Sequence, residues 1–518
     1  MKRFPFFFVV GLALMLLVSC NNNPESYNGA EYTVMFYGVG GKDLDKELAL
    51  NLKEALGVGT NDRVHFTAEI KFSKALQAPD PVYAVRDTKP FDPGFSHRGT
   101  VRLHLDPGAA AFTVDATLPL DTPLYRPDVI ADYIKWTKEK FPARKYIMVL
   151  WDHGGGWLPG VEDDGPKTSV AFSGAGPLAS LSALPPNRAV AYDDNLDDKA
   201  ISISELVEGI KLSDTRMELV YYDACYMNML ENLGELREVA AYSLGAGHIT
   251  PGLGGDYGTL LQLLGGGGGD TREIISEYCY LLMNHWNLLS DDPADITFTD
   301  LSKLQGVFDV VKKVADELVA SNSIYGTEYY SQGIPVMTKE WVVGFPDNVT
   351  HVYNDRGNAD KFDSTTGVPN SFNGTVINDG DNLLNLNKYL PPKPYVYFYD
   401  KALKYASEDY SGTEHNYIFA DIYNYVEYVA MRSNNPKLIT YASQLLTAAN
   451  KAIIYGEESD KLPVLTTFSV TLINKSWWNR DYKPNGAYEK LTFDKATSWS
   501  KWLQINEALA RITTNNVL

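Results

Sequence analysis

Two stretches of the sequence combine an apolar, strand-like run with a reactive side chain at its carboxyl end. Residues 145–157 are KYIMVLWDHGGGW, and residues 217–227 are MELVYYDACYM. His153 follows the first apolar run and Cys225 follows the second. Because open α/β sheets bind ligands at the carboxyl ends of their strands, we predict that this imidazole and this thiol meet at one edge of a sheet.

Further apolar runs alternate with amphipathic stretches along the chain. Strands are expected at 32–37, 64–72 and 242–246. After the first of these, leucines that recur every four residues predict a helix from Asp43. This alternation is typical of an α/β fold with a mostly parallel sheet. The glycines at 38–41 do not complete a G-x-G-x-x-G fingerprint, which excludes a dinucleotide site of that type.

The N-terminal segment has the pattern of an export signal with a lipid-attachment site. Two basic residues precede an apolar run at 6–18, which is shorter than the roughly 20 residues that a spanning helix needs. The run ends in LVSC, typical of a bacterial lipobox, in which Cys20 would carry the lipid. We expect a signal peptide at 1–19, a polar tether at 20–30, and an exported, lipid-anchored protein of the bacterial cell envelope. A plain secretory signal with an incidental Cys20 is the alternative.

The charge balance limits the partners. The chain has 46 lysine and arginine residues and 65 aspartate and glutamate residues, which give a formal net charge of −19. Such a surface repels nucleic acid and anionic membranes, so we expect no nucleic-acid partner and membrane contact only through the lipid anchor. It favours cationic substrates or divalent cations, although solvation alone accounts for most of these charges.

The cysteines favour a functional thiol. If Cys20 carries lipid, only Cys225 and Cys279 remain, and an exported protein could join them in a disulfide. However, Cys279 lies in an apolar helical pattern and is expected in the core. Cys225 could likewise be a small buried residue, but a single thiol that accompanies a histidine motif is better explained by catalysis.

Three motifs resemble those of the clostripain-type cysteine peptidases, family C11. They are WDHGGGW at 151–157, YDDN at 192–195 and YYDACYMNMLE at 221–231, and the order of histidine before cysteine is also that family's. The resemblance implies a caspase-like fold, a mostly parallel sheet flanked by helices, with long insertions and a C-terminal α+β extension.

The resemblance also implies how the chain is divided. The catalytic core would span 31–300, and 301–518 would complete the peptidase unit. Residues 321–414 are rich in Asn, Asp, Gly, Pro and Tyr, and we expect an insertion there.

Peptide hydrolysis is the activity that the resemblance implies. Cys225 would be the nucleophile, and His153 would act as the general base and then as the acid that protonates the leaving amine. The N–H groups of Gly154 and Cys225 would bind the oxyanion, because a residue without Cβ lets its backbone approach the reacting carbonyl. Asp152 should point away from His153, so no third catalytic group is expected.

Clostripain-like enzymes cut after arginine or lysine, which implies a peptide or protein substrate with a basic P1 residue and an acid in the S1 pocket. Asp223 matches the aspartate of the D-A-C motif, and Asp256 is the second candidate. Either carboxylate could instead make structural hydrogen bonds or cap a turn. Gly247 and His248 stand where the family often has Ser-Glu. This difference bears on the predicted substrate preference more than on the predicted class of enzyme.

Maturation cleavage is a further family property. Residues 158–189 form a loop-like segment rich in Gly, Pro, Ser and Ala, and its basic residues are Lys167 and Arg188. Cleavage by the enzyme itself would follow one of them. A loop that remains uncut is the alternative.

Calcium is a possible cofactor, because the family's best-known member depends on it; no organic cofactor is expected. Residues 192–199, YDDNLDDK, offer oxygen ligands that include Asp193 and Asp194. The stretch does not fit the EF-hand pattern. Several of its acidic residues are explained equally well by a following helix, because acidic side chains are favourable near a helix N-terminus.

Two other functions remain open. The chain could be a catalytically silent family member kept as a binding lipoprotein. It could also be a surface lipoprotein that binds carbohydrate, since aromatic residues make up 12% of the chain and exposed aromatics stack on sugars. Carbohydrate binding does not require the paired motifs, and we predict a cysteine endopeptidase.

Overall fold

The computed structural model describes residues 29–40, 44–72, 99–157, 190–193, 196, 199–247, 250–290, 294–323, 419–433, 435–458, 469–471 and 488–503. Cys20, Lys167, Arg188 and Asp194 lie outside these residues, as does all but the first three residues of the expected insertion at 321–414. Within the described part of the chain, no helix has both the length and the hydropathy that membrane crossing requires.

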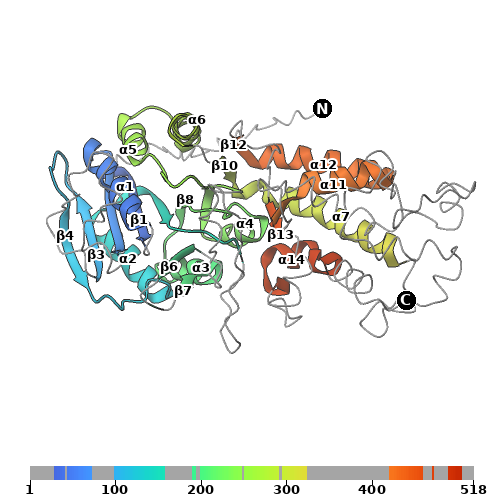
Figure 1. Cartoon of the computed structure of the whole chain (residues 1–518), viewed down its shortest axis with the longest axis horizontal. Coiled ribbons are helices and arrows are strands. Elements are labelled where there is room, and N and C mark those ends of the chain that lie inside the picture. The colour runs from blue at the N-terminus through green and yellow to red at the C-terminus, as the bar shows by residue number, and fades with distance from the viewer. Residues whose placement is uncertain are drawn as a thin grey trace, which may run out of the picture.

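A nine-stranded sheet forms the centre of the molecule, in the order β12-β10-β9-β8-β5-β1-β2-β3-β4 (Figure 1). Five neighbouring strands run parallel. They are β9 (Ala240–Gly245), β8 (Met217–Asp223), β5 (Ala143–Trp151), β1 (Ala30–Val39) and β2 (Val64–Phe72). The structure confirms the mostly parallel sheet and the strands expected in it. Their apolar runs are nearly continuous because both faces of the sheet are covered.

Antiparallel strands extend the sheet at both edges. On one side β3 (Gly99–Leu105) pairs with β2, and β4 (Thr113–Leu118) pairs with β3. On the other side β10 (Asp295–Asp300) pairs with β9 and with β12 (Ile453–Glu458). Because β12 comes from late in the chain, the C-terminal part completes the central sheet. Two further sheets have two strands each, β6 (Val190–Asp193) with β7 (Lys199–Ile201) and β11 (Phe419–Asp421) with β13 (Ser469–Thr471).

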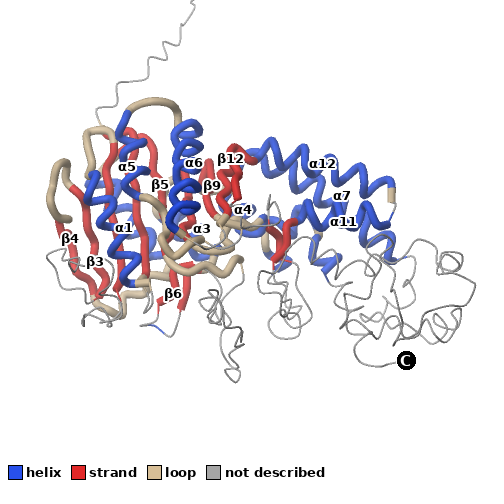
Figure 2. The backbone as a smooth tube through the Cα atoms, turned by 45° about the horizontal axis from the view of Figure 1, so that its top comes forward, coloured by secondary structure: helices blue, strands red, loops and turns tan. Residues whose placement is uncertain are grey.

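Helices cover both faces of the sheet (Figure 2). Alternate residues of the central strands pack against one helical layer or the other. One layer contains α1 (Asp45–Val58), α5 (Tyr257–Gly266) and α6 (Thr271–Leu289). The other contains α2 (Pro127–Lys140), α3 (Ile203–Leu212) and α4 (Leu230–Leu236). Just before α4, the N–H of Asn228 donates to the carbonyl of Ala246 at 2.9 Å, which ties this segment to the residue after β9.

Helices of the C-terminal part extend from the β12 edge of the sheet (Figure 2). They are α7 (Leu304–Ser323), which follows the 3-10 turn η4 (Leu301–Lys303), α11 (Ile422–Ser433) and α12 (Pro436–Ala452). The turn η8 (Tyr488–Lys490) and α14 (Thr492–Thr497) fold back toward the core. There the ring of Tyr488 packs edge-on against Trp157 at 4.9 Å, and its hydroxyl donates to Glu231 at 2.9 Å.

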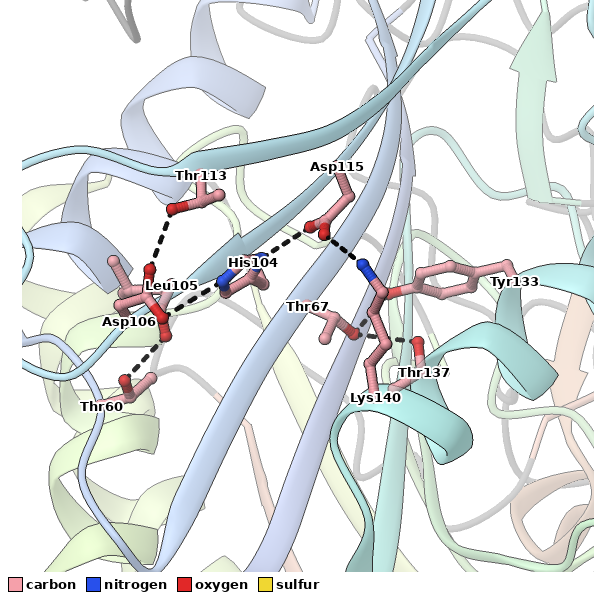
Figure 3. Close-up of polar contacts among 10 residues, drawn as sticks. All are labelled: Thr60, Thr67, His104, Leu105, Asp106, Thr113, Asp115, Tyr133, Thr137 and Lys140. Atoms are coloured by element: carbon pink, nitrogen blue, oxygen red, sulfur yellow. Dashed lines mark hydrogen bonds and ion pairs between the residues drawn. The ribbon is translucent and has the colours of Figure 1, made fainter.

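A charged cluster lies at the opposite edge of the sheet (Figure 3). The ring of His104 lies between Asp115, 2.6 Å from Nδ1, and Asp106, 3.2 Å from Nε2. Lys140 of α2 reaches the second oxygen of Asp115 at 2.9 Å. The cluster ties β3 and β4 to α2, away from the strand ends that carry His153 and Cys225.

Candidate active site

The turn that carries His153 lies directly against the backbone of Cys225. β5 and β8 are parallel neighbours, and their last residues, Trp151 and Asp223, are paired, so both strands end at the same edge of the sheet. A Cβ built on Gly154 would lie 2.1 Å from the carbonyl oxygen of Cys225 and 2.8 Å from its nitrogen. Only glycine allows this approach, so the turn that carries the half-buried His153 lies against the backbone of the half-buried Cys225.

Strand β6 holds the histidine turn from the other side. Val190 forms a bridge with Gly154, and the N–H of Tyr192 donates to the buried carboxylate of Asp152. The Asp152 side chain is therefore engaged by β6, and the turn is fixed between β6 and the backbone of Cys225.

Asp193, the next residue of β6, is buried and forms an ion pair with buried Lys71 at the end of β2. The Lys71 ammonium also donates to the carbonyl of Thr122 at 2.6 Å. The carboxylate that the sequence offers to calcium thus has a lysine partner. Among the residues that the structure describes, no group of three or more His, Cys, Asp or Glu side chains is arranged to hold a metal ion.

The Cys225 thiol contacts the backbone of Thr250. Its Sγ accepts the N–H of Thr250 at 3.3 Å and lies 3.8 Å from the carbonyl oxygen of the same residue. The pKa of the thiol is raised to about 11: burial is the largest cause, the Thr250 N–H lowers the pKa, and the carboxylates of Asp223 and Asp295 add to the increase. Cys279 is also a free thiol, buried in α6, so the two cysteines are not joined. An imidazole beside such a thiol can remove its proton at the moment of attack.

Asp223 is 3% exposed and lies beneath the loop that follows β9. Its Oδ2 accepts the N–H of Gly255 at 2.7 Å and the hydroxyl of Tyr257 at 2.6 Å. Its Oδ1 has no hydrogen-bond partner within the described part of the chain. Burial raises the pKa of this carboxyl to about 6, although the two donors lower it. Asp223 therefore anchors the loop with one oxygen and leaves the other available.

Asp256 has a different environment. It is the N-cap of α5, and its carboxylate accepts the N–H and the hydroxyl of Thr259 at 2.9 Å and 2.6 Å. The structure thus gives Asp256 the capping role that the sequence left as one of its two uses.

Two residues were not singled out from the sequence: Thr250, which contacts the thiol, and Asn51, which contacts the loop that follows Thr250. Thr250 is an ordinary loop residue, and nothing in its local pattern identifies it. Asn51 did carry a signal, since it lies with Leu48 and Leu52 on the buried side of α1, where a polar side chain needs a partner.

Several solved structures share this fold. A secreted C11 cysteine protease from Bacteroides thetaiotaomicron, "iotapain", aligns with a TM-score of 0.51 and 14% identity, over 90% of this chain and 99% of its own. A secreted C11 cysteine protease from the same organism, in complex with an irreversible peptide inhibitor, aligns with a TM-score of 0.51 and 13% identity, over 91% of this chain and 99% of its own. An inactive zymogen C11 protease from Parabacteroides distasonis aligns with a TM-score of 0.51 and 14% identity, over 91% and 98%.

Comparison with curated proteins gives no significant match. The profile of the Clostripain family matches residues 121–505, a range that includes both His153 and Cys225. With the mostly parallel sheet described above, this match shows that the chain belongs to the clostripain family and has the fold of the C11 cysteine proteases.

Proposed function

We propose that this protein is an active cysteine endopeptidase that uses Cys225 and His153 as a dyad. The observation that carries the proposal is the contact of Gly154 with the Cys225 backbone, which holds the histidine turn next to the residue that carries the thiol. Since burial raises the thiol pKa to about 11, Cys225 is protonated at neutral pH, and a nearby base is needed to generate the nucleophile.

The reaction follows the chemistry of the two side chains. His153 takes the thiol proton while Sγ attacks the scissile carbonyl carbon, and the N–H groups of Gly154 and Cys225 stabilise the oxyanion. As the C–N bond breaks, the imidazolium of His153 gives its proton to the leaving amine. Water, deprotonated by His153, then hydrolyses the thioester and regenerates the thiol.

We propose a preference for arginine or lysine at P1, with Asp223 as the acid that binds it. A buried carboxylate with one oxygen unpaired among the described residues favours a cationic side chain, which would supply the missing donors and keep the carboxyl ionised. Asp256 supports this preference less well, because both of its oxygens cap α5.

The test uses a soluble form that begins after Cys20, together with Cys225→Ala and His153→Ala. Each is assayed on fluorogenic peptides with Arg, Lys, Asp or Leu at P1, with calcium and with a chelator. Cleavage after Arg or Lys that both substitutions abolish supports the proposal. No cleavage, with Cys225 inert to a thiol-directed peptide inhibitor, would indicate a silent family member that binds a ligand.

The same samples test the remaining proposals. An intact mass that is lower in the active form than in Cys225→Ala would identify a cut after Lys167 or Arg188.

Activity or a melting temperature that rises with calcium would support a calcium site near Asp193 and Asp194. For the lipid anchor, the full chain and Cys20→Ser are expressed in bacteria, and only the former is expected in the membrane fraction.

A further inference from the structure

A buried hydrogen-bond network holds the 250–255 loop over Cys225, and the dyad chemistry does not explain it. The loop begins at Thr250, whose N–H donates to Sγ of Cys225, and it ends beside α5. Its turn is closed by a hydrogen bond from the N–H of Gly254 to the carbonyl of Pro251 at 2.9 Å. The conformation of this loop therefore fixes the position of the Thr250 N–H relative to Sγ of Cys225.

Asn51 of α1 is the centre of the network. It is 1% exposed, and its Nδ2 lies 3.0 Å from the carbonyl oxygen of Leu253 and 3.2 Å from that of Gly255. Its Oδ1 accepts the indole N–H of Trp151 at 2.8 Å. Trp151 ends the strand that leads to His153, so Asn51 joins the histidine strand to the loop that touches the cysteine.

The loop has little freedom to move. The indole N–H of Trp286 donates to the carbonyl of Gly254 at 2.8 Å. Gly254 has a φ of +67°, and a Cβ built there would lie 2.5 Å from Oδ1 of Asn51 and 3.0 Å from Oδ2 of Asp223. The loop is thus packed directly onto two buried polar side chains, and its conformation requires glycine at this position.

The charges around Cys225 explain why a donor is needed there. Asp295 is buried at the start of β10, where it accepts the N–H of Gly247 at 2.7 Å. Together with Asp223 it places negative charge near the thiol, and burial removes the water that would solvate a thiolate. A backbone N–H that points at Sγ offsets part of this cost, because hydrogen bonds to charged groups are stronger than those to neutral ones.

We propose that the backbone N–H of Thr250 is a further catalytic group that stabilises the Cys225 thiolate, and that Asn51 is the positioning residue that holds the Thr250 loop in place. This inference rests on the proposed peptidase function, because it assigns these groups to the same reaction. The Thr250 N–H would stabilise the negative charge on the attacking sulfur, whereas the oxyanion donors stabilise the charge on the substrate's carbonyl oxygen.

The test measures the thiolate directly and needs no peptide substrate. The rate of alkylation of Cys225 by iodoacetamide is followed by mass from pH 5 to pH 11, with Cys225→Ala as background. Thr250→Pro removes the N–H, and Thr250→Ala keeps it. Because the thiol pKa is about 11, the rate between pH 7 and pH 9 is proportional to the thiolate fraction, and we expect Thr250→Pro to be alkylated about 10- to 100-fold more slowly than Thr250→Ala in that range. Identical profiles for the two variants would overturn the inference.

Two further variants keep the test decisive if Thr250→Pro fails to fold. Replacing Thr250 by its α-hydroxy acid turns the amide into an ester, which removes the N–H and retains the side chain. Asn51→Ala releases the loop, and we expect it to shift the alkylation profile in the same direction and to lower kcat more than it raises KM. His104→Ala, at the far edge of the sheet, is the control for lost stability and should leave the profile unchanged.

The two proposals can fail separately. If the wild-type protein cleaves peptides but the profiles of Thr250→Pro and Thr250→Ala coincide, the thiolate role is wrong and the peptidase function stands. If no peptide is cleaved but the profiles differ, the N–H of Thr250 does stabilise the thiolate, and the proposed peptidase function is wrong.

Discussion

Gly154 and Cys225 are in van der Waals contact through their backbones, and the contact leaves no room for a Cβ at position 154. The Cβ of an alanine would lie 2.1 Å from the Cys225 carbonyl oxygen and 3.0 Å from the Cβ of Ala224. The relative position of the two motifs therefore depends on one missing methyl group.

Gly154→Ala should reduce activity while the protein stays folded. The added methyl group must push the histidine turn away from Cys225, and a displacement of about 1 Å at a catalytic group can cost about 10²-fold in rate. We expect kcat/KM to fall by at least about that factor. Gly306→Ala in α7 is the matched control, since its Cβ meets nothing within 4 Å, and it should stabilise the helix by up to about 1 kcal/mol without loss of activity. Full activity in Gly154→Ala would refute the proposed contact between the histidine turn and Cys225.

Asp223→Asn should change the P1 preference. Loss of the charge removes the attraction for a cationic P1 side chain, while the amide oxygen can still accept the Gly255 N–H and the Tyr257 hydroxyl. We expect kcat/KM to fall at least about tenfold for Arg substrates and much less for Leu substrates. Asp256→Asn is the comparison, and it should mainly weaken the cap of α5, by about 1 kcal/mol.

The same carboxyl predicts a pH effect. Its pKa is raised to about 6, so it loses its charge as the pH falls through that value. KM for Arg substrates should rise below pH 6, and KM for Leu substrates should not follow it. A KM for Arg peptides that is constant from pH 5 to pH 8 would show that another acid binds P1.

The central strands were predictable because both of their faces are buried. An apolar run is then nearly continuous, and the predicted strand at 64–72 coincides with β2. The edge strands carry a weaker signal. Most β4 residues are exposed or half-buried, and β12 has the sequence IIYGEE, so its place beside β10 depends on a contact between distant parts of the chain.

Within the site, the sequence predicted the positions that strand order alone determines. His153 and Cys225 each follow an apolar run, and parallel strands deliver both to one edge of the sheet. The contacts of Asn51 and Thr250 depend on how α1 and the 250–255 loop pack, which no local pattern encodes. The buried position of Asn51 among leucines was the one signal that could have led to this network.

Glu54→Gln should stabilise the protein above neutral pH. Glu54 is partly buried beside Asn51, and burial raises its pKa from 4.5 to about 7. Between pH 4.5 and pH 7 the folded state therefore holds a proton that the unfolded state has released, so the contribution of Glu54 to the free energy of unfolding is greatest below pH 4.5 and is lost as the pH rises to 7. We expect Glu54→Gln to gain about 1–2 kcal/mol over the wild type at pH 8 and almost nothing at pH 4.5, in urea unfolding. An equal difference at both pH values would mean that the charge of Glu54 is not responsible.

The buried pair of Lys71 and Asp193 should be needed for stability and for the position of β6. Asp193→Asn leaves the Lys71 ammonium buried without its counter-charge, which typically costs about 3–5 kcal/mol. β6 contacts the histidine turn through Val190 and Tyr192, so kcat should fall as well. The double variant Lys71→Met with Asp193→Leu should recover most of the stability, because it removes both charges together.

Asp316→Asn is the control for this pair, because Asp316 forms an exposed ion pair with Lys312 on α7 at 3.0 Å. Its loss should change the free energy of unfolding by no more than about 0.5 kcal/mol.

Urea unfolding with and without calcium also shows whether Asp193 acts as the partner of Lys71 or as a metal ligand. If the lysine is the partner that matters, added calcium should not restore the stability of Asp193→Asn, and the double variant should stay folded in a chelator. If calcium instead stabilises the wild type by several kcal/mol and has no effect on the double variant, Asp193 is a metal ligand, and the ion pair with Lys71 is only its metal-free arrangement.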